Sequence, residues 1–198
     1  MTDLQRQFGN IDIYLFDQLL RGRLQPGMRI LDAGCGGGRN LVYLIAQGYE
    51  VFAVDESEEA INKVRQMAPN LPAANFRCES IESMSFPDQF FDFIIAHSVL
   101  HFAHDDIHFE AMLSNIFDKL KIGGILFCRL ASTIGIEHLV QPIQGRRQRT
   151  PDGGERYLVD VELLDHIATH HGEIIDPIKT TIVNNQRSMT TWVIRRTK

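Results

Sequence analysis

Residues 29–40 read RILDAGCGGGRN, an apolar run that reaches Asp32 and is followed at once by a loop rich in glycine. Glycine permits backbone conformations and close approaches that a side chain would block, at an entropic cost in the folded state. A chain that places its most permissive residues directly after a buried strand is therefore expected to hold a ligand against that backbone.

Apolar periodicity and capping residues predict that helices and strands alternate around this loop. We expect an opening helix over 10–23, with Asn10 as its N-cap, and further helices over 40–48, 57–68, 105–121 and 159–172. We expect strands over 28–33, 50–55, 74–78, 90–100 and 125–130, and then two consecutive strands over 173–183 and 189–196.

This alternation is typical of a parallel sheet with helices on both faces, so the predicted fold class is an α/β three-layer sandwich. The two consecutive strands at the end predict an antiparallel C-terminal hairpin at one edge. In such sheets the ligand lies at the carboxyl ends of the strands. One site is therefore expected to gather the loops that follow Asp32, Asp55, Cys78, Ala96 and Leu130.

Composition limits the classes of partner. The net charge of -5 argues against coverage of nucleic acid by bulk electrostatics. The three cysteines, Cys35, Cys78 and Cys128, cannot form a paired framework, and each is expected to be a buried, reduced thiol. Without an apolar segment long enough to span a membrane, the chain is expected to be cytoplasmic, with no membrane partner.

The spacing of the glycines separates the ligand classes that use such loops. A dinucleotide fingerprint, G-x-G-x-x-G, needs a third glycine at position 39, where this chain has Arg39. A phosphate-binding P-loop needs Gly-Lys-Ser/Thr, which does not follow here. The loop instead has the pattern D-x-G-x-G-x-G from Asp32 to Gly38.

With this pattern the sequence resembles the class I methyltransferases that depend on S-adenosyl-L-methionine (SAM) and have a seven-strand, mostly parallel, Rossmann-like sheet. LDAGCGGGRN resembles their first motif, VFAVDES their second strand with its terminal acid, CESIESMSFPDQFFDFI their adenine segment, and LKIGGILF their turn into the fifth strand. These motifs cover about residues 29–130. A looser similarity connects the chain to the small, single-domain tellurite-resistance and thiopurine methyltransferases.

The resemblance implies SAM as cofactor and assigns its contacts to particular residues. Asp32, Gly34 and Gly36 would face the methionine portion, Asp55 and Glu56 the ribose, and Ser80 and Ile81 the adenine, with His97 near the transferred methyl group. Many relatives have Asp at the position of Ser80, which leaves the partner of the adenine amino group open between Ser80, Glu79 and Glu82. Tyr14 either caps the methyl pocket or belongs to the core, and Arg39 either meets the SAM carboxylate or lies on the surface.

Methyl transfer from a sulfonium is a direct displacement, so the enzyme mainly aligns the reacting atoms. A general base is needed only where the acceptor must lose a proton. His97 and His101 are the candidate catalytic residues, each as a base or as a group that orients the acceptor. No metal is expected, because no cysteine or carboxylate completes a strong pattern with the histidines at 97, 101, 104 and 108.

Residues 1–198 are expected to form one domain, with an N-terminal helical cap over 1–25 and a loop insertion over 131–157 near the acceptor site. The insertion holds Arg146, Arg147, Arg149 and Arg156, which would bind an anionic substrate or form a solvated loop. The sequence thus predicts a methyltransferase that acts on a small molecule. A protein or RNA substrate, and a non-catalytic SAM-binding protein, remain alternatives; whether 131–157 is a lid, and the oligomeric state, stay open.

Overall fold

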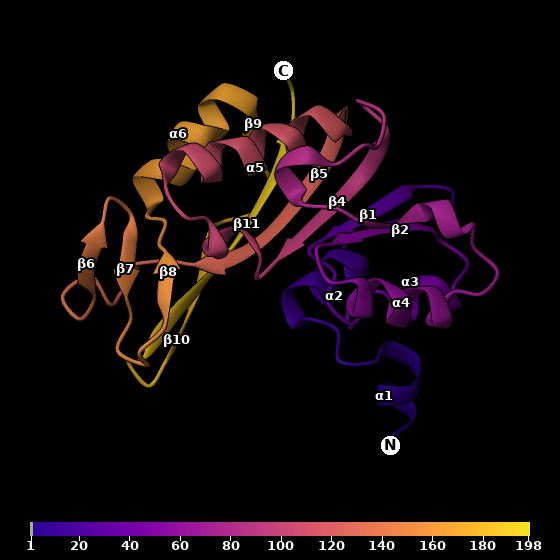
Figure 1. Cartoon of the computed structure of the whole chain (residues 1–198), viewed down its shortest axis with the longest axis horizontal. Coiled ribbons are helices and arrows are strands. Elements are labelled where there is room, and N and C mark those ends of the chain that lie inside the picture. The colour runs from indigo at the N-terminus through magenta and orange to yellow at the C-terminus, as the bar shows by residue number, and fades with distance from the viewer. Residues whose placement is uncertain (1) are drawn as a thin grey trace.

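The computed structural model describes residues 2–198, and its largest element is a twisted sheet with helices on both faces (Figure 1). The strands of this sheet are β1 (Arg29–Ala33), β2 (Glu50–Asp55), β3 (Phe76–Cys78), β4 (Phe91–His97), β5 (Leu120–Ala131), β9 (Gly172–Ile174), β10 (Lys179–Val183) and β11 (Arg187–Arg196). Their order is β10-β11-β5-β4-β1-β2-β3, and β9 pairs with β11 outside this path.

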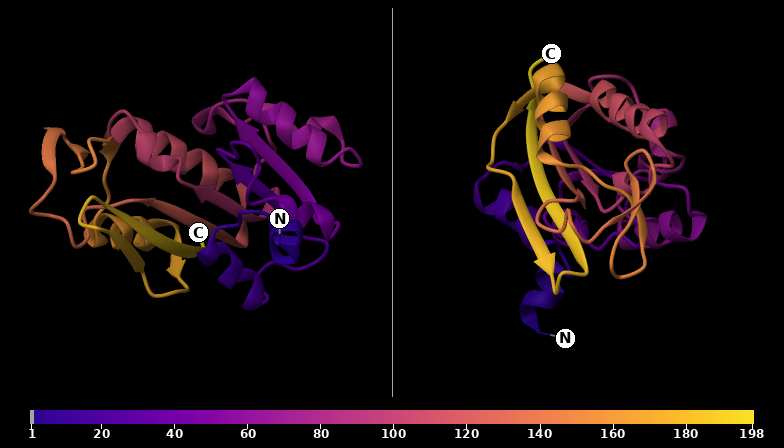
Figure 2. Two further views of the ribbon diagram at one scale, coloured as in Figure 1. Left: turned by 90° about the horizontal axis from the view of Figure 1, so that it is seen from below. Right: turned by 90° about the vertical axis from the view of Figure 1, so that its left-hand side faces the viewer.

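The pairing confirms the predicted Rossmann-like topology. Parallel ladders join β1 to β2 and to β4, β2 to β3, and β4 to β5. The last strand, β11, is antiparallel to β5 and to β10, and Figure 2 shows β10 and β11 as the expected hairpin along one side of the molecule. The strand order reverses between β1 and β4, so the ligand is expected above the carboxyl ends of these two strands.

Side chains of successive strand residues enter two separate cores, as the alternation of a pleated strand requires. On one face Leu31, Val54 and Ala96 pack under α5 (Asp106–Lys119) and α6 (Val161–His171). The other face is covered by α2 (Ile13–Leu20), α3 (Val42–Ala46) and α4 (Glu58–Met67), over strand residues that include Ile30, Val51, Ala53, Phe93 and Ile95. This is the three-layer sandwich that the sequence predicts.

The N-terminal region forms two helices, α1 (Asp3–Phe8) and α2, and the second begins later than predicted. Asp12 is the N-cap of α2, because its Oδ1 accepts hydrogen bonds from the backbone N–H groups of Tyr14 (2.9 Å) and Leu15 (3.3 Å). The expectation that Asn10 caps this helix was wrong. Asp12 is the stronger cap here since its carboxylate lies within reach of both free N–H groups.

The segment 131–157 is not an irregular loop. It contains a small antiparallel sheet of β6 (Gln141–Gln144), β7 (Arg147–Arg149) and β8 (Glu155–Tyr157), which stands apart from the main sheet in Figure 1. The side chains of β6 are exposed throughout, so no apolar alternation marks it in the sequence. Glu155 forms ion pairs with Arg147 (3.4 Å) and Arg149 (2.6 Å) across this sheet.

Two further expectations need correction. The single strand expected over 173–183 is divided into β9 and β10, and Pro177, which has no N–H for a ladder, lies in the gap. Cys78 is exposed rather than buried, unlike Cys35 and Cys128.

Short 3₁₀ helices complete the described elements: η1 (Ala73–Asn75), η2 (Ile81–Ser83) and η3 (Leu100–Phe102). Within residues 2–198 no helix is both long and apolar enough to cross a bilayer.

Candidate functional site

After β1, the glycine loop has backbone conformations that residues with side chains rarely adopt. Gly34, Gly36 and Gly38 have φ angles of 75°, 49° and 75°, in the left-handed region. A Cβ at Gly34 would lie 2.4 Å from Cγ2 of Val99, whereas a Cβ at Gly36 would point into open space. Gly34 therefore lets the loop after β4 pack closely, and Gly36 leaves room above the loop for a ligand.

Asp55, the last residue of β2, holds this loop in place. Its Oδ2 accepts a hydrogen bond from the backbone N–H of Gly36 at 2.8 Å, and its Oδ1 accepts one from the N–H of Ser57 at 2.9 Å. A carboxylate offers about four acceptor positions, so both oxygens can still accept a donor from a ligand. The side chain lines a cavity of about 420 Å³.

Asp32, near the end of β1, is a buried carboxyl group without a hydrogen-bond partner among the described residues. Its residue is 1% exposed, and within residues 2–198 neither carboxylate oxygen has a hydrogen-bond partner. Burial raises the pKa of Asp32 to about 7; the charge of Arg39 lowers this pKa and the charge of Asp55 raises it. Since buried polar groups are nearly always satisfied, this carboxylate is suited to a positively charged or hydrogen-bonding group supplied by a ligand.

The cavity of about 420 Å³ extends from the glycine loop toward α5. Glu56, Ile81, Glu79 and Glu82 line it, together with Val99, His104, His108 and Met112. Ser80 is not among the lining residues, and its hydroxyl is hydrogen bonded to that of Ser83 at 2.8 Å. Of the three residues considered for contact with an adenine amino group, Glu79 and Glu82 line this cavity and Ser80 does not.

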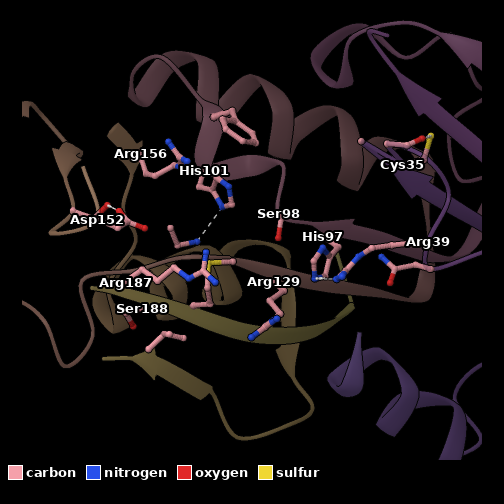
Figure 3. A pocket seen from close by; sticks show the side chains of 18 of the residues that line it. Cys35, Arg39, His97, Ser98, His101, Arg129, Asp152, Arg156, Arg187 and Ser188 are labelled. Atoms are coloured by element: carbon pink, nitrogen blue, oxygen red, sulfur yellow. Dashed lines mark hydrogen bonds between the residues drawn. The ribbon is translucent and has the colours of Figure 1, made fainter. Parts of the chain in front are cut away.

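A second cavity, of about 610 Å³, lies on the other side of the glycine loop (Figure 3). Both cavities are lined by Gly34, Gly36, Ser98 and Phe102, so the two meet over the loop. Residues of the loop, of β5, of the small sheet and of β11 line the larger cavity; among them are Cys35, Arg39, Asn40, His97, His101, Arg129, Thr150, Asp152, Arg156, Arg187 and Met189.

His97, the last residue of β4, belongs to a charged network on the wall of the larger cavity. Its Nε2 lies 2.9 Å from Nη2 of Arg39 and 3.1 Å from Oδ2 of Asp12, and the same Asp12 oxygen accepts from Arg129 at 2.7 Å. Burial alone would raise the pKa of Asp12, but the hydrogen bond from His97 and the charge of Arg129 lower it to about 2. Asp12 is thus an ionised anchor, and it draws His97 and both guanidinium groups toward α2.

His101, in η3, is held differently. Its Nδ1 accepts a hydrogen bond from the backbone N–H of Ala131 at 3.2 Å, so a neutral ring carries its proton on Nε2. Burial and, to a smaller extent, the charges of Arg156 and His97 lower the pKa of His101 to about 4. At neutral pH the residue is therefore a hydrogen-bond donor at the edge of the cavity.

Tyr14 lies in α2, and neither cavity is lined by it. Its hydroxyl is hydrogen bonded to that of Thr181 in β10 at 2.8 Å, and the guanidinium of Arg129 lies 5.1 Å from the centre of its ring. Tyr14 thus supports the wall from behind, through Arg129.

Sequence reasoning missed several lining residues. Ser98 has a φ of 58°, rare for a residue with a side chain, and its N–H donates to the carbonyl of Arg129 at 2.7 Å. No sequence signal marks this conformation. Phe102 and Arg187 were also missed; the first sits in a short 3₁₀ helix and the second begins a strand far away in the chain. Within the described residues, no group of three or more His, Cys, Asp or Glu could hold a metal ion.

Comparison with known proteins agrees with this geometry. Residues 31–128 match the family described as "Methyltransferase domain". The chain carries a class I, Rossmann-like methyltransferase domain. The ubiquinone biosynthesis O-methyltransferase of Coxiella burnetii is 34% identical over 105 residues, which are 51% of this chain and 42% of that protein. The chain spans less than half the length of the first curated relatives that it matches.

Two solved structures share the fold of this methyltransferase domain. The 1,6-didemethyltoxoflavin-N1-methyltransferase of Burkholderia thailandensis, solved with 1,6-didemethyltoxoflavin and S-adenosylhomocysteine (SAH) bound, has a TM-score of 0.71 and 19% identity, covering 99% of this chain and 82% of that chain. A TehB-like SAM-dependent methyltransferase of Corynebacterium glutamicum has a TM-score of 0.61 and 20% identity, covering 93% and 89%. At these identities the likeness shows the fold alone.

Proposed function

We propose that this protein is a SAM-dependent methyltransferase that transfers a methyl group to a small-molecule acceptor. The observation that carries the proposal is the meeting of two cavities over the glycine loop, beside which Asp55 still has free acceptor positions. Asp32 lines neither cavity; it lies buried at the end of β1, with both carboxylate oxygens unpaired among the described residues. When bound, SAM would supply an activated methyl group attached to a sulfonium sulfur. The methyl group is transferred to the acceptor, and the electron pair of the broken S–C bond stays on sulfur. The residues present fit this cofactor.

In this proposal the smaller cavity and the glycine loop bind the cofactor. Asp55 accepts hydrogen bonds from the ribose hydroxyls, with Glu56 beside it, and Ile81 packs against the adenine. Asp32 lies beneath the loop, where its charge favours the positively charged methionine portion. Gly34 and Gly36 let the cofactor approach the backbone. Within about 420 Å³ the smaller cavity brings Asp55, Glu56 and Ile81 to the same space.

The larger cavity takes the acceptor. Its volume of about 610 Å³ lies within the range of about 300–1,000 Å³ that is common for small-molecule sites, which favours a small acceptor over a protein or RNA. The Nε2–H group of His101 donates a hydrogen bond to the methyl acceptor and orients it; the ring is not the general base, since a group with a pKa of about 4 is a weak base. His97, which lines the larger cavity alone, stands beside the loop on the acceptor side.

Isothermal titration with SAM, SAH and NAD tests the cofactor assignment. Micromolar binding of the two adenosyl compounds and none of NAD is the expected result. Release of SAH from SAM in the presence of small thiols and hydroxyl compounds then tests transfer. Binding of SAM without any transfer would favour the non-catalytic alternative, and transfer only to protein or RNA would favour a macromolecular substrate.

A further inference from the structure

The larger cavity is strongly cationic. The side chains of Arg39, Arg129, Arg156 and Arg187 line it, and among the described residues Asp152 is the carboxylate that lines it with them. The first two arginines face Asp12, 3.8 Å from Arg39 and 2.7 Å from Arg129. Arg156 and Arg187 lie with Asp152 at the opposite end from Cys35 and Arg39, as Figure 3 shows. The cavity therefore has two ends with different electrostatics.

Arg156 and Arg187 are the arginines of this cavity whose positive charge is not neutralised by an ion pair among the described residues. Among residues 2–198 neither takes part in an ion pair; Nη1 of Arg156 donates to the carbonyl of Glu155 at 2.8 Å. The other arginines of the 131–157 segment are paired, Arg146 with Asp160 at 2.7 Å and Arg147 and Arg149 with Glu155. These three do not line the cavity.

Asp152 reduces this charge without cancelling it. Its Oδ1 accepts hydrogen bonds from Oγ1 of Thr150 at 2.5 Å and from the N–H of Gly154 at 3.1 Å, both within its own turn. The bond from Thr150 holds the pKa of Asp152 below its ordinary value, although partial burial acts the other way. Two guanidinium groups and one ionised carboxylate leave a net charge of about +1 at this end, which suits a monoanion better than a dianion.

We propose that the methyl acceptor is a small carboxylate, bound through its carboxylate group by Arg156 and Arg187. This inference rests on the proposed function. The arginine fork matches a carboxylate in two parallel hydrogen bonds, which fixes direction as well as position. With the carboxylate at that end, the rest of the acceptor passes His101 and Phe102 and presents its nucleophilic atom at the glycine loop. Phe102 lines both cavities and lies 5.2 Å from the guanidinium of Arg156.

Paired ligands test the charge preference directly. The wild-type protein, saturated with SAH, is titrated with 4-hydroxybenzoate, benzoate and mercaptoacetate, each compared with its own primary amide, and with phenyl phosphate. At least one carboxylate is expected to bind about tenfold or more tightly than its amide, the usual range for hydrogen bonds to a charged partner. The preference is expected to fall to about twofold or less in R156Q/R187Q, with each single variant in between.

Arg195→Gln is the matched control, because Arg195 is also an exposed arginine of β11 but does not line the cavity. It removes one positive charge and should leave the preference unchanged. The proposal is overturned if the amides bind as well as the carboxylates, if no carboxylate binds to SAH-loaded wild type, or if the preference survives in the double variant. Tighter binding of phenyl phosphate than of every carboxylate would overturn the choice of a monoanion.

The SAH titration separates this proposal from the one on which it rests. If wild-type protein does not bind SAH, the proposed function fails, whatever the carboxylates do. The same ligand pairs titrated without SAH then show whether the arginine end still selects a carboxylate. If SAH binds and the carboxylate preference is absent, the methyltransferase assignment stands and only the acceptor class is wrong.

Discussion

The backbone N–H of Gly36 donates a hydrogen bond to the carboxylate of Asp55 at 2.8 Å, which joins the middle of the glycine loop to the end of the neighbouring strand. The bond forms because β1 and β2 are adjacent and parallel, so that their carboxyl ends lie at the same edge of the sheet. One acid thus shapes the loop and remains available to a ligand above it.

Replacing Asp55 with alanine should weaken SAM binding by about 1.5–3 kcal/mol, the range for losing a charge-assisted hydrogen-bond partner. Isothermal titration gives the affinity, and circular dichroism shows whether the variant is folded. Glu58→Ala is the control, because Glu58 is an acid nearby in the first turn of α4 that lines neither cavity. Equal affinities of a folded Asp55→Ala protein and wild type would contradict the ribose contact.

Alanine at Gly34 should destabilise the fold by about 2–4 kcal/mol, because the new Cβ meets Val99 in addition to a backbone strained for any side chain. Alanine at Gly36 should cost only about 1 kcal/mol, since its Cβ has open space. That methyl group would nevertheless occupy the room proposed for SAM, so Gly36→Ala should bind SAM poorly while remaining folded. Urea unfolding and titration separate the two effects. A reversed order of stabilities would show that packing against Val99 does not select glycine at 34.

Asp32→Asn should stabilise the protein free of SAM and weaken its binding of SAM. Burial raises the pKa of Asp32 from 3.8 to about 7, so between these values the folded chain holds a proton that the unfolded chain releases. Stability therefore falls as the pH rises through this window. Asparagine removes that fall, a gain on the order of 4 kcal/mol at about pH 8 relative to pH 4.

Urea unfolding of wild type and Asp32→Asn at both pH values measures this difference, since the other titrating groups cancel between the two proteins. The same pH dependence in both would mean that Asp32 is not the source. Unchanged affinity for SAM would mean that its carboxylate does not face the cofactor.

His101 should produce the opposite slope at lower pH. Burial lowers its pKa from 6.5 to about 4, so as the pH falls below 6.5 the unfolded chain binds a proton that the folded chain does not. Stability is therefore lost between these values on acidification, by about 3 kcal/mol for this group. In His101→Asn the amide oxygen can still accept from the N–H of Ala131, and this part of the acid dependence should vanish. If the variant follows the wild-type curve, the ring is not buried as a neutral group.

Long, strongly patterned elements could be predicted from the sequence, and short polar ones could not. The strands β2, β4 and β5 each carry a continuous apolar run because helices cover the sheet on both faces, and those runs are visible in the chain. The small sheet at 141–157 is held by backbone ladders and by the ion pairs of Glu155, which leave no periodic signal. The N-cap was misplaced because Asn10 and Asp12 are both good caps and only geometry decides between them.

The same contrast holds for the candidate site: the part formed by local motifs could be predicted, and the part formed by distant segments could not. The proposed cofactor side lies in one stretch of chain with recognisable motifs, and the structure places Gly34, Gly36, Asp55, Glu56 and Ile81 around one cavity. The proposed acceptor side is assembled from distant segments, so Arg187 and Phe102 carried no local signal. Among the arginines of the 131–157 segment, the sequence could not tell that Arg156 faces the cavity while Arg146 is paired with Asp160.

The place of β11 in the sheet has a consequence for how the chain folds. This strand runs between β5 and β10, buries Trp192, and carries Arg187 at one end of the larger cavity. During synthesis β1 to β4 can pair as soon as they emerge, but β5 keeps an open edge until residues 187–196 leave the ribosome. The half of the molecule that would bind SAM is thus made early, whereas the half that would select the acceptor closes with the last strand. An unfinished chain exposes the long apolar edge of β5, which can pair with strands of other chains.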